Sequence, residues 1–286
     1  LPNLLPGGRP LSDAAARVDI AAAWGVDVLS SAPGRDTDAI LAAAAQGELK
    51  ALVVGAVDID DLGDRALALA ALDAADFIVS LEVRASEVTQ RADVVLPVGP
   101  VAERSGTFVN WEGRLRPFTQ VLDSSALTDV RALAGIAEEL GDGLGFRTVE
   151  GAWAEMAEVG PWDGDFASFE PVAAQPPPSP AAGEYVLSTW RTLIDDSRAV
   201  DGEPYLSATG KQAVAVVSPA ALERLGLRTG DSVTVSTDNG SISLPVMSGD
   251  LADDVVWVPT SSTGSHVHRE LGAAAGSSVR VEGGAR

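Results

Sequence analysis

The chain has 286 residues, with 41 acidic and 20 basic side chains and a formal net charge of -21 at pH 7. This charge repels nucleic-acid phosphates and anionic lipid surfaces, so neither is expected as a partner. The apolar stretches are shorter than the ~20 residues that a membrane-spanning helix needs, so direct membrane insertion is not expected. The chain has no cysteine, which excludes clusters held by cysteine thiolates from these residues.

The first part of the chain alternates short apolar runs with helical patterns. Helices are predicted over residues 37–46, with Asp36 or Thr37 as cap and Gly47 as stop, and over residues 65–74. Runs of β-branched or aromatic residues bounded by Gly, Pro or Asp predict strands at 26–29, 51–54, 77–81 and 94–96. Strands that alternate with helices indicate a mainly parallel sheet. A Rossmann-like α/β domain is therefore expected, incomplete because an absent upstream part contributes further strands.

The pattern changes after residue 117. Two helices are predicted at 127–140 and 151–158, and five prolines within 171–183 favour an extended linker. The last hundred residues are β-rich, with predicted strands at 214–217, 232–236, 241–246, 255–258 and 278–281. Asn239-Gly240 predicts a hairpin turn because both residues tolerate a positive φ. The domain boundaries expected are 1–170, a linker at 171–184, and 185–286.

A motif follows the strand that ends at Pro97. It reads Glu103, then Gly106-Thr-Phe-Val-Asn110, then Glu112-Gly-Arg114, and the two glycines bracket an expected loop. This motif resembles the molybdopterin oxidoreductase superfamily. Within it, the Asn-x-Glu-Gly-Arg ending and residues 80–89 look most like the large iron-sulfur subunits of bacterial NADH:quinone oxidoreductase, respiratory complex I. The phrases at 218–227 and 230–235 resemble the superfamily's C-terminal double-psi barrel.

The resemblance implies a function. The chain would be a structural and interaction portion of a peripheral-arm subunit, on the cytoplasmic side of the inner membrane, supporting electron transfer from NADH to quinone coupled to proton translocation. Its partners would be other subunits of that arm, and it would carry no catalytic residues itself. Because the chain starts at Leu1 without Met, it is interpreted as a C-terminal piece, with [4Fe-4S] and [2Fe-2S] clusters in the upstream part. The alternative is the C-terminal half of an active molybdenum or tungsten enzyme, such as a formate dehydrogenase or nitrate reductase. A free-standing nucleotide-binding protein is disfavoured because Gly-x-Gly-x-x-Gly is absent.

The resemblance also places a pterin-dinucleotide cleft, expected here to be vestigial, near Gly55, Ala56, Thr189, Trp190 and Arg191. Trp190 stands where relatives have a glycine that lets the backbone approach the ligand, and its indole is expected to fill that space among apolar neighbours with its N–H bonded. Two acidic residues, Asp195 and Asp196, follow where relatives carry His or Thr, and they oppose a polyphosphate. No bound cofactor is therefore expected.

Other candidate sites have simpler explanations. Residues 202–211 lack the Walker spacing of a phosphate loop. His266 and His268 are not accompanied by a Glu or third His at helical spacing, so no metal site is expected. A solvated loop explains Asp58, Asp60 and Asp61 better than a cation site does, and a turn explains the glycosylation sequon at residues 239–241. Arg114, Arg116 and Asn110 are expected to support an interdomain loop by hydrogen bonds.

Overall fold

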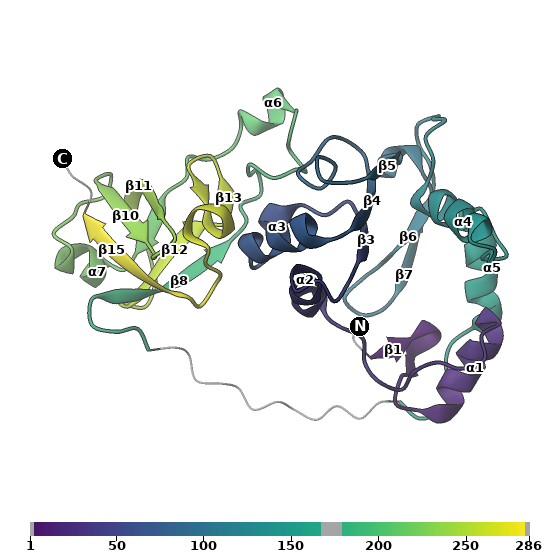
Figure 1. The fold of residues 1–286 in the computed structure, drawn as a ribbon. Helices are drawn as coiled ribbons and strands as arrows, with labels where there is room; N and C mark the ends of the chain where they lie inside the picture. The colour runs from purple at the N-terminus through teal and green to yellow at the C-terminus, as the bar shows by residue number, and fades with distance from the viewer. Residues whose placement is uncertain (1–2, 167–178, 284–286) are drawn as a thin grey trace. The chain divides into compact units, whose positions relative to one another are not determined.

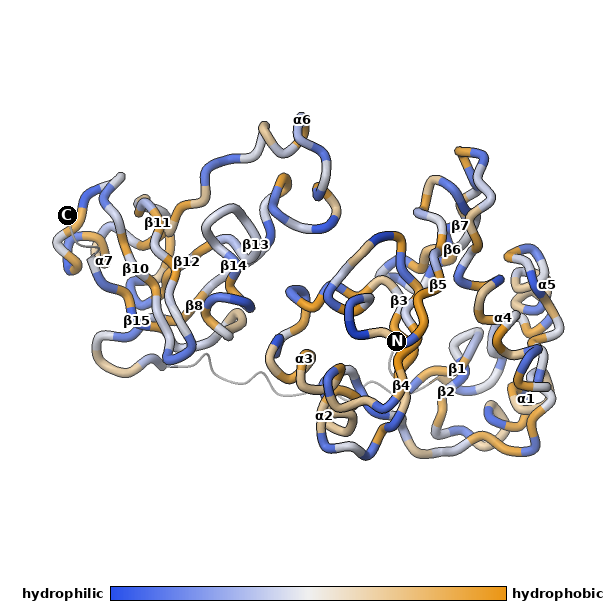
Figure 2. Tube along the Cα trace, turned by 45° about the horizontal axis from the view of Figure 1, so that its top comes forward, coloured by the Kyte–Doolittle hydropathy of each residue, from blue (hydrophilic) through white to orange (hydrophobic). Residues whose placement is uncertain are grey.

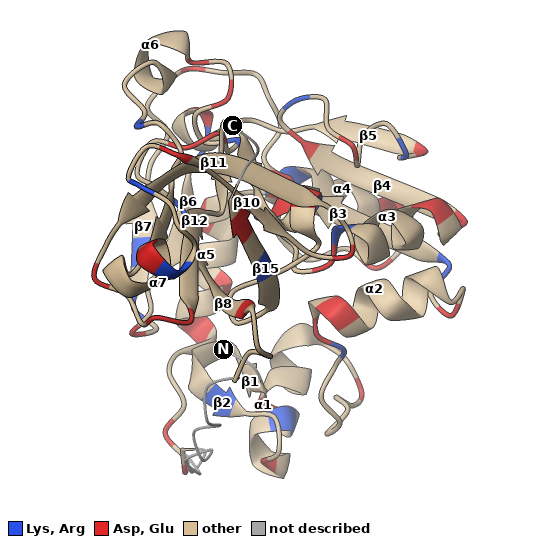
Figure 3. Ribbon diagram, turned by 90° about the vertical axis from the view of Figure 1, so that its left-hand side faces the viewer, with Lys and Arg blue, Asp and Glu red and all other residues tan. Residues whose placement is uncertain are grey.

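The computed structural model describes residues 3–166 and 179–283. It divides into two units, Leu1–Ala56 with Ala75–Val172, and Val57–Ala74 with Ala173–Arg286. Most of the expected Pro-rich linker lies outside the described residues. Within the described residues no helix is long and apolar enough to cross a membrane. Acidic residues occur on helices, strands and loops of both units (Figure 3).

The first unit contains a three-stranded parallel sheet in the order β3-β4-β5 (Figure 1). The strands are β3 (Ala51–Gly55), β4 (Phe77–Glu82) and β5 (Val94–Pro97), which confirms the three predicted strands. Leu81 is buried with Val98 and Ala132, the latter from helix α4 (Asp129–Glu139). Strands β3 to β5 are largely hydrophobic in sequence (Figure 2), and Val53 of β3 remains 62% exposed.

Helices of the first unit begin at side-chain caps. The carboxylate of Asp36 accepts the amide of Ala39 at the start of α2, and the hydroxyl of Thr128 accepts that of Arg131 at the start of α4. The helices are α1 (Ala14–Trp24), α2 (Thr37–Ala45), α4 (Asp129–Glu139) and α5 (Val149–Val159). The short strands β1 (Leu4–Leu5) and β2 (Arg9–Pro10) pair near the start of the chain.

Two predictions for this unit were wrong. Residues 26–29 form no strand, because α1 ends at Gly25 in the left-handed region and Val28 is 80% exposed with no strand beside it to pair with. The expected loop of the motif is a β-hairpin, in which β6 (Gly106–Val109) pairs antiparallel with β7 (Leu115–Phe118).

The second unit is built on a closed six-stranded barrel in the order β10-β11-β9-β12-β8-β15. Two of its neighbour pairs, β11 with β9 and β12 with β8, are parallel. The barrel strands are β8 (Glu184–Trp190), β9 (Ala215–Val217), β10 (Ser232–Ser236), β11 (Ser241–Ser248), β12 (Val255–Pro259) and β15 (Ser278–Gly283). The unit also contains α3 (Arg65–Ala74), α6 (Pro204–Ser207) and α7 (Pro219–Arg224), the short pair β13 (Ser261–Ser262) and β14 (Ser265–His266), and a π-helical turn, Val267–Leu271.

The interior of the barrel is apolar, as the alternation of residues predicts. Six predicted core residues are at most 5% exposed, and Leu225 and Leu227 pack against them from α7 and the turn after it. The six are Val233, Val235, Ile242, Leu244, Val256 and Val258. The Asn239-Gly240 turn forms, but neither residue adopts a positive φ. Glycine is needed at 240 for a different reason, since a Cβ there would lie 2.3 Å from the carbonyl oxygen of Glu270.

Candidate functional site

The barrel strand β8 ends at Thr189 and Trp190, two of the residues expected near a vestigial pterin-dinucleotide cleft. Thr189 donates its hydroxyl hydrogen bond to the carbonyl of Val258 at 2.8 Å and also contacts the hydroxyl of Thr260 at 2.8 Å. The first contact joins β8 to the neighbouring strand β12, with which β8 is in parallel register, and the second reaches the residue that follows β12. The side chain of Thr189 therefore serves the barrel's own hydrogen bonding.

Trp190, the last residue of β8, is 58% exposed. One face of its ring meets Trp257 of β12, with ring centroids 4.9 Å apart and planes tilted by 43°. No hydrogen-bond partner of its indole N–H lies among the described residues. The expected apolar contact is thus made to Trp257, whereas the expected partner of the indole N–H is not found among the described residues, because the ring lies at the end of the strand, beyond the packed interior.

Arg191 is held by acidic side chains of its own unit. Its guanidinium forms an ion pair with Asp61 and lies 3.6 Å from the carboxylate of Asp195. The Asp195 side chain is only 5% exposed and also accepts the amide of Ser197 at 3.0 Å. Two carboxylates therefore offset the charge of Arg191, which lowers its attraction for an anionic ligand.

A second set of ionic contacts links the loop after β3 to the π-helical turn. The carboxylate of Asp60 pairs with Arg65 at 2.7 Å and with Arg269 at 3.4 Å. The carbonyl of Asp60 also lies 2.9 Å from Nδ1 of His268. Asp58 caps the same loop by accepting the amide of Asp60 at 3.1 Å. The acidic loop thus has structural partners in its own unit, a role that the sequence did not reveal.

The other histidine also has an ordinary structural partner. Nε2 of His266 lies 3.2 Å from the carboxylate of Asp196, and the backbone amide of His266 donates to Glu270 at 3.2 Å. Among residues 3–166 and 179–283, no group of three or more His, Cys, Asp or Glu side chains is arranged to hold a metal ion.

Gly55 and Ala56 end β3 in the first unit. The amide of Ala56 donates to the carbonyl of Leu81 at 3.1 Å, which keeps the chain beside β4 for one more residue. Ala56 has a φ of 52°, a conformation that costs a residue with a Cβ about 1 kcal/mol relative to glycine. A Cβ built on Gly55 would have no described atom within 4 Å. The packing of the protein therefore does not require a glycine at this position.

The motif that carries the family resemblance builds the turn of the β6–β7 hairpin. Oδ1 of Asn110 accepts the amides of Glu112 at 3.1 Å and Arg114 at 2.9 Å, and Gly113 closes the turn with a φ of 78°. Arg114 pairs with Glu112 at 3.1 Å. Asn110 and Arg114 therefore stabilise their own hairpin, whereas the guanidinium of Arg116 donates to the adjacent carbonyl of Leu115 at 3.4 Å.

Comparison with known proteins identifies the family. Residues 11–140 match the family model of molybdopterin oxidoreductases, and residues 185–282 match that of the molybdopterin dinucleotide-binding domain. The chain belongs to the molybdopterin oxidoreductase family. The resemblance seen in the sequence is thus confirmed.

Relatives of this molybdopterin oxidoreductase chain include the G subunits of NADH-quinone oxidoreductase from two actinobacteria. The chain is 49% identical to the G subunit of Mycobacterium tuberculosis over 288 residues, covering 99% of this chain and 36% of that protein. It is 44% identical to the G subunit of Streptomyces coelicolor, covering 98% and 34%. The chain thus spans about a third of the length of these relatives.

A solved structure shares the fold. Acetylene hydratase from Pelobacter acetylenicus superposes with a TM-score of 0.57 at 17% identity, over 85% of this chain and 42% of that one. This likeness concerns the fold alone.

Replacing Trp190 by glycine should lower the free energy of unfolding by about 1–2 kcal/mol. This is less than the ~3–5 kcal/mol for core aromatic residues, because more than half of the ring is already in water. The contact with Trp257 and the extra backbone entropy of glycine account for the loss. Urea titration checks it, with Trp190→Phe as the control that keeps a ring against Trp257. A loss above about 4 kcal/mol would contradict the half-exposed position of the ring.

Proposed function

We propose that this chain is a structural and interaction portion of a peripheral-arm subunit of NADH-quinone oxidoreductase. The observation that carries the proposal is the 49% identity to the mycobacterial G subunit, which extends over 99% of the chain and both of its units. The chain would support electron transfer from NADH to quinone, coupled to proton translocation, by packing and subunit contacts. It would lie in a complex attached to the cytoplasmic side of the membrane, with other peripheral-arm subunits as partners.

We also propose a finer description of the domains. The parallel strands β3 to β5, which form one sheet, support a Rossmann-like domain over residues 1–170. The closed barrel with two parallel neighbour pairs supports a double-psi barrel over residues 185–286, after a linker at 171–184. The [4Fe-4S] and [2Fe-2S] clusters of such a subunit would reside outside these residues, because cysteine is absent here.

The residues at the end of β8 do not fit a pterin dinucleotide. Arg191, the group that would attract a phosphate, is already paired with Asp61 and Asp195. The indole of Trp190 stands beside it where a glycine would leave the backbone open. A polyphosphate would have to displace two carboxylates and overcome their repulsion. The proposal is therefore that Gly55, Ala56, Thr189, Trp190 and Arg191 are a vestige of the family's cleft and bind no cofactor.

Elemental analysis of the intact native protein tests this proposal. The full-length subunit, purified with its complex, is expected to contain iron but no stoichiometric molybdenum or tungsten, and heat should release no guanine nucleotide. A metal-loaded formate dehydrogenase serves as the positive control. One molybdenum or tungsten per chain would overturn the proposal and support an active pterin oxidoreductase instead. Purification of the native protein without any NADH-oxidising activity would contradict the assignment to the complex.

A further inference from the structure

The β6–β7 hairpin of the first unit places large apolar side chains in water. Trp111 in its turn is 89% exposed. Phe108 and Val109 of β6 are 55% and 61% exposed, and Leu115 of β7 is 51% exposed. Val109 and Leu115 are cross-strand partners on one face of the hairpin, whereas Phe108 lies on the opposite face. Exposed apolar side chains of this size commonly mark an interaction surface.

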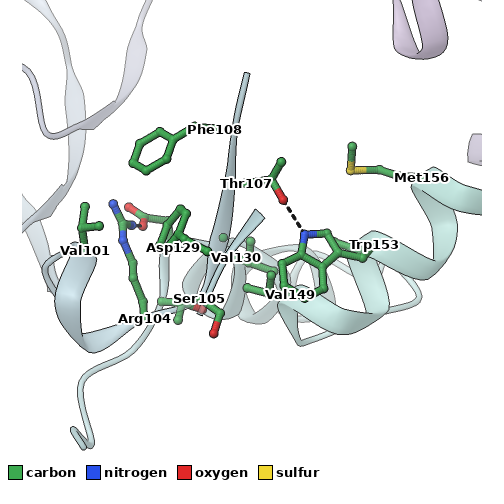
Figure 4. A pocket seen from close by; sticks show the side chains of 14 residues that line it. Val101, Arg104, Ser105, Thr107, Phe108, Asp129, Val130, Val149, Trp153 and Met156 are labelled. Atoms are coloured by element: carbon green, nitrogen blue, oxygen red, sulfur yellow. Dashed lines mark hydrogen bonds and ion pairs between the residues drawn. The ribbon is translucent and has the colours of Figure 1, made fainter. Parts of the chain in front are cut away.

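The hairpin is also stiff. The two amide bonds to Asn110 and the ion pair of Arg114 with Glu112 fix its turn, and these are the residues of the family motif. At its base, the indole N–H of Trp153 on α5 donates to the hydroxyl of Thr107 at 2.6 Å (Figure 4). The motif therefore fixes the backbone of the turn that carries Trp111, so little loop entropy is lost when a partner binds.

A hollow of about 350 Å³ adjoins the base of the hairpin. Phe108, Trp153 and Met156 supply much of its apolar lining, and the ion pair of Arg104 with Asp129 lies at one side (Figure 4). A partner that covers the hairpin can thus also place an apolar side chain between the hairpin and α5.

The charge of this segment differs from that of the rest of the chain. The hairpin, residues 106–118, carries two arginines and one glutamate, within a protein whose net charge is -21. Arg104 and Arg114 are paired within the unit, whereas Arg116 is exposed and has no ion-pair partner among the described residues. A partner that complements this surface is therefore acidic. Tryptophan and arginine are also the residues most enriched at the energetic centres of protein interfaces.

We propose that the β6–β7 hairpin docks onto another protein chain of the same assembly, whose contacting surface is an apolar pocket rimmed by carboxylates. Trp111 enters that pocket, and Arg116 pairs with a carboxylate at its edge. This inference rests on the proposed function, since it requires that the chain works within a complex.

Photo-cross-linking in the native complex tests the proposal. The photoreactive residue p-benzoylphenylalanine replaces Trp111 in the full-length subunit within its host cells, and the purified complex is irradiated. A cross-link to an acidic segment of a different polypeptide is expected. Leu193, which is 96% exposed in the second unit, is the matched control position and should give no cross-link to that segment. A cross-link within the same polypeptide or to a second copy, or no cross-link at 111, would overturn the proposal.

Side-chain variants give an independent measurement. Trp111→Ala and Arg116→Glu should each weaken retention of the subunit in the complex during gel filtration, by about thirtyfold for Trp111→Ala. The loss for Arg116→Glu should grow as NaCl is lowered, because repulsion is then less screened. Arg116→Lys, and Lys211→Glu in the second unit, should be retained normally, and all four variants should keep the parent melting temperature. Normal retention of Trp111→Ala would contradict the proposal.

These outcomes separate the inference from the function on which it rests. If the subunit purifies with an NADH-oxidising complex but position 111 gives no cross-link to a neighbour, the docking role alone fails. If the native subunit is found in no complex, both the docking role and the proposed function fail.

Discussion

Replacing Val235 by aspartate should cost the chain at least about 4 kcal/mol of unfolding free energy. Val235 is 1% exposed in β10 and belongs to the apolar interior of the barrel. Among the described residues of the second unit, no Lys or Arg is buried, so the new carboxylate would be buried without a partner or would have to be protonated. Urea titration, with hydrogen exchange at the amides of β10 and β11 as the local measurement, should show the loss in the second unit.

The neighbouring strand provides the control for this prediction. Ser243 of β11 is exposed on the outer face of the same barrel, where an added carboxylate stays in water. Ser243→Asp should therefore change the free energy of unfolding by less than about 0.5 kcal/mol. Equal effects at the two positions would contradict the assignment of inward and outward residues.

The strands of both units could be predicted because local signals determine them. Residues 51–54 and 77–81 are apolar runs between turn-forming residues, and the structure places them in neighbouring parallel strands. In the barrel, the alternation at Val233 and Val235 separates buried from exposed positions, since a strand turns successive side chains to opposite faces. Such strands can be recognised from their own residues, without knowing which strand they pair with.

The sequence-based predictions failed for segments whose structure depends on pairing with another strand. Residues 26–29 are as apolar as a strand, yet no neighbouring strand is available to them, and the left-handed Gly25 follows a helix that the Ala-rich sequence did not reveal. The hairpin at 106–118 was interpreted as a loop, because its glycines are typical of loops. Gly106 instead gives room for the ring of Phe118, because a Cβ added at residue 106 would lie 2.7 Å from the Cζ atom of that ring.

The candidate site was only partly predictable for the same reason. Two unfavourable features, Trp190 and Asp195, are close to Arg191 in sequence and could be recognised there. The pairing of Arg191 with Asp61, and of Arg269 with Asp60, joins segments far apart in the chain. No local pattern indicates such a contact, so the acidic loop was interpreted as merely solvated.

Replacing Arg9 by methionine should destabilise the first unit by about 3 kcal/mol. The guanidinium is nearly buried, pairs with Asp19 at 2.6 Å, and donates to the carbonyls of Val159 and Gly160, each at 2.9 Å. It therefore joins the start of the chain to the end of α5. Methionine keeps much of the volume but leaves these carbonyls without a donor, at a cost of about 1–3 kcal/mol for each buried group. Asp19 is half exposed and can be hydrated, which limits the loss.

A nearby indole makes this prediction measurable. The guanidinium of Arg9 lies 5.5 Å from the ring centroid of Trp162, so the fluorescence of Trp162 should shift in the Arg9→Met variant, and urea titration gives the change in stability. Arg35→Met removes an exposed pair with Glu48 and should cost less than about 1 kcal/mol. Gly7→Ala tests the same site independently, because the added Cβ would lie 2.3 Å from a nitrogen of the Arg9 guanidinium and should also destabilise the unit. Equal stability of the Arg9→Met and Arg35→Met variants would show that the buried contacts of Arg9 do not hold the end of α5 to the start of the chain.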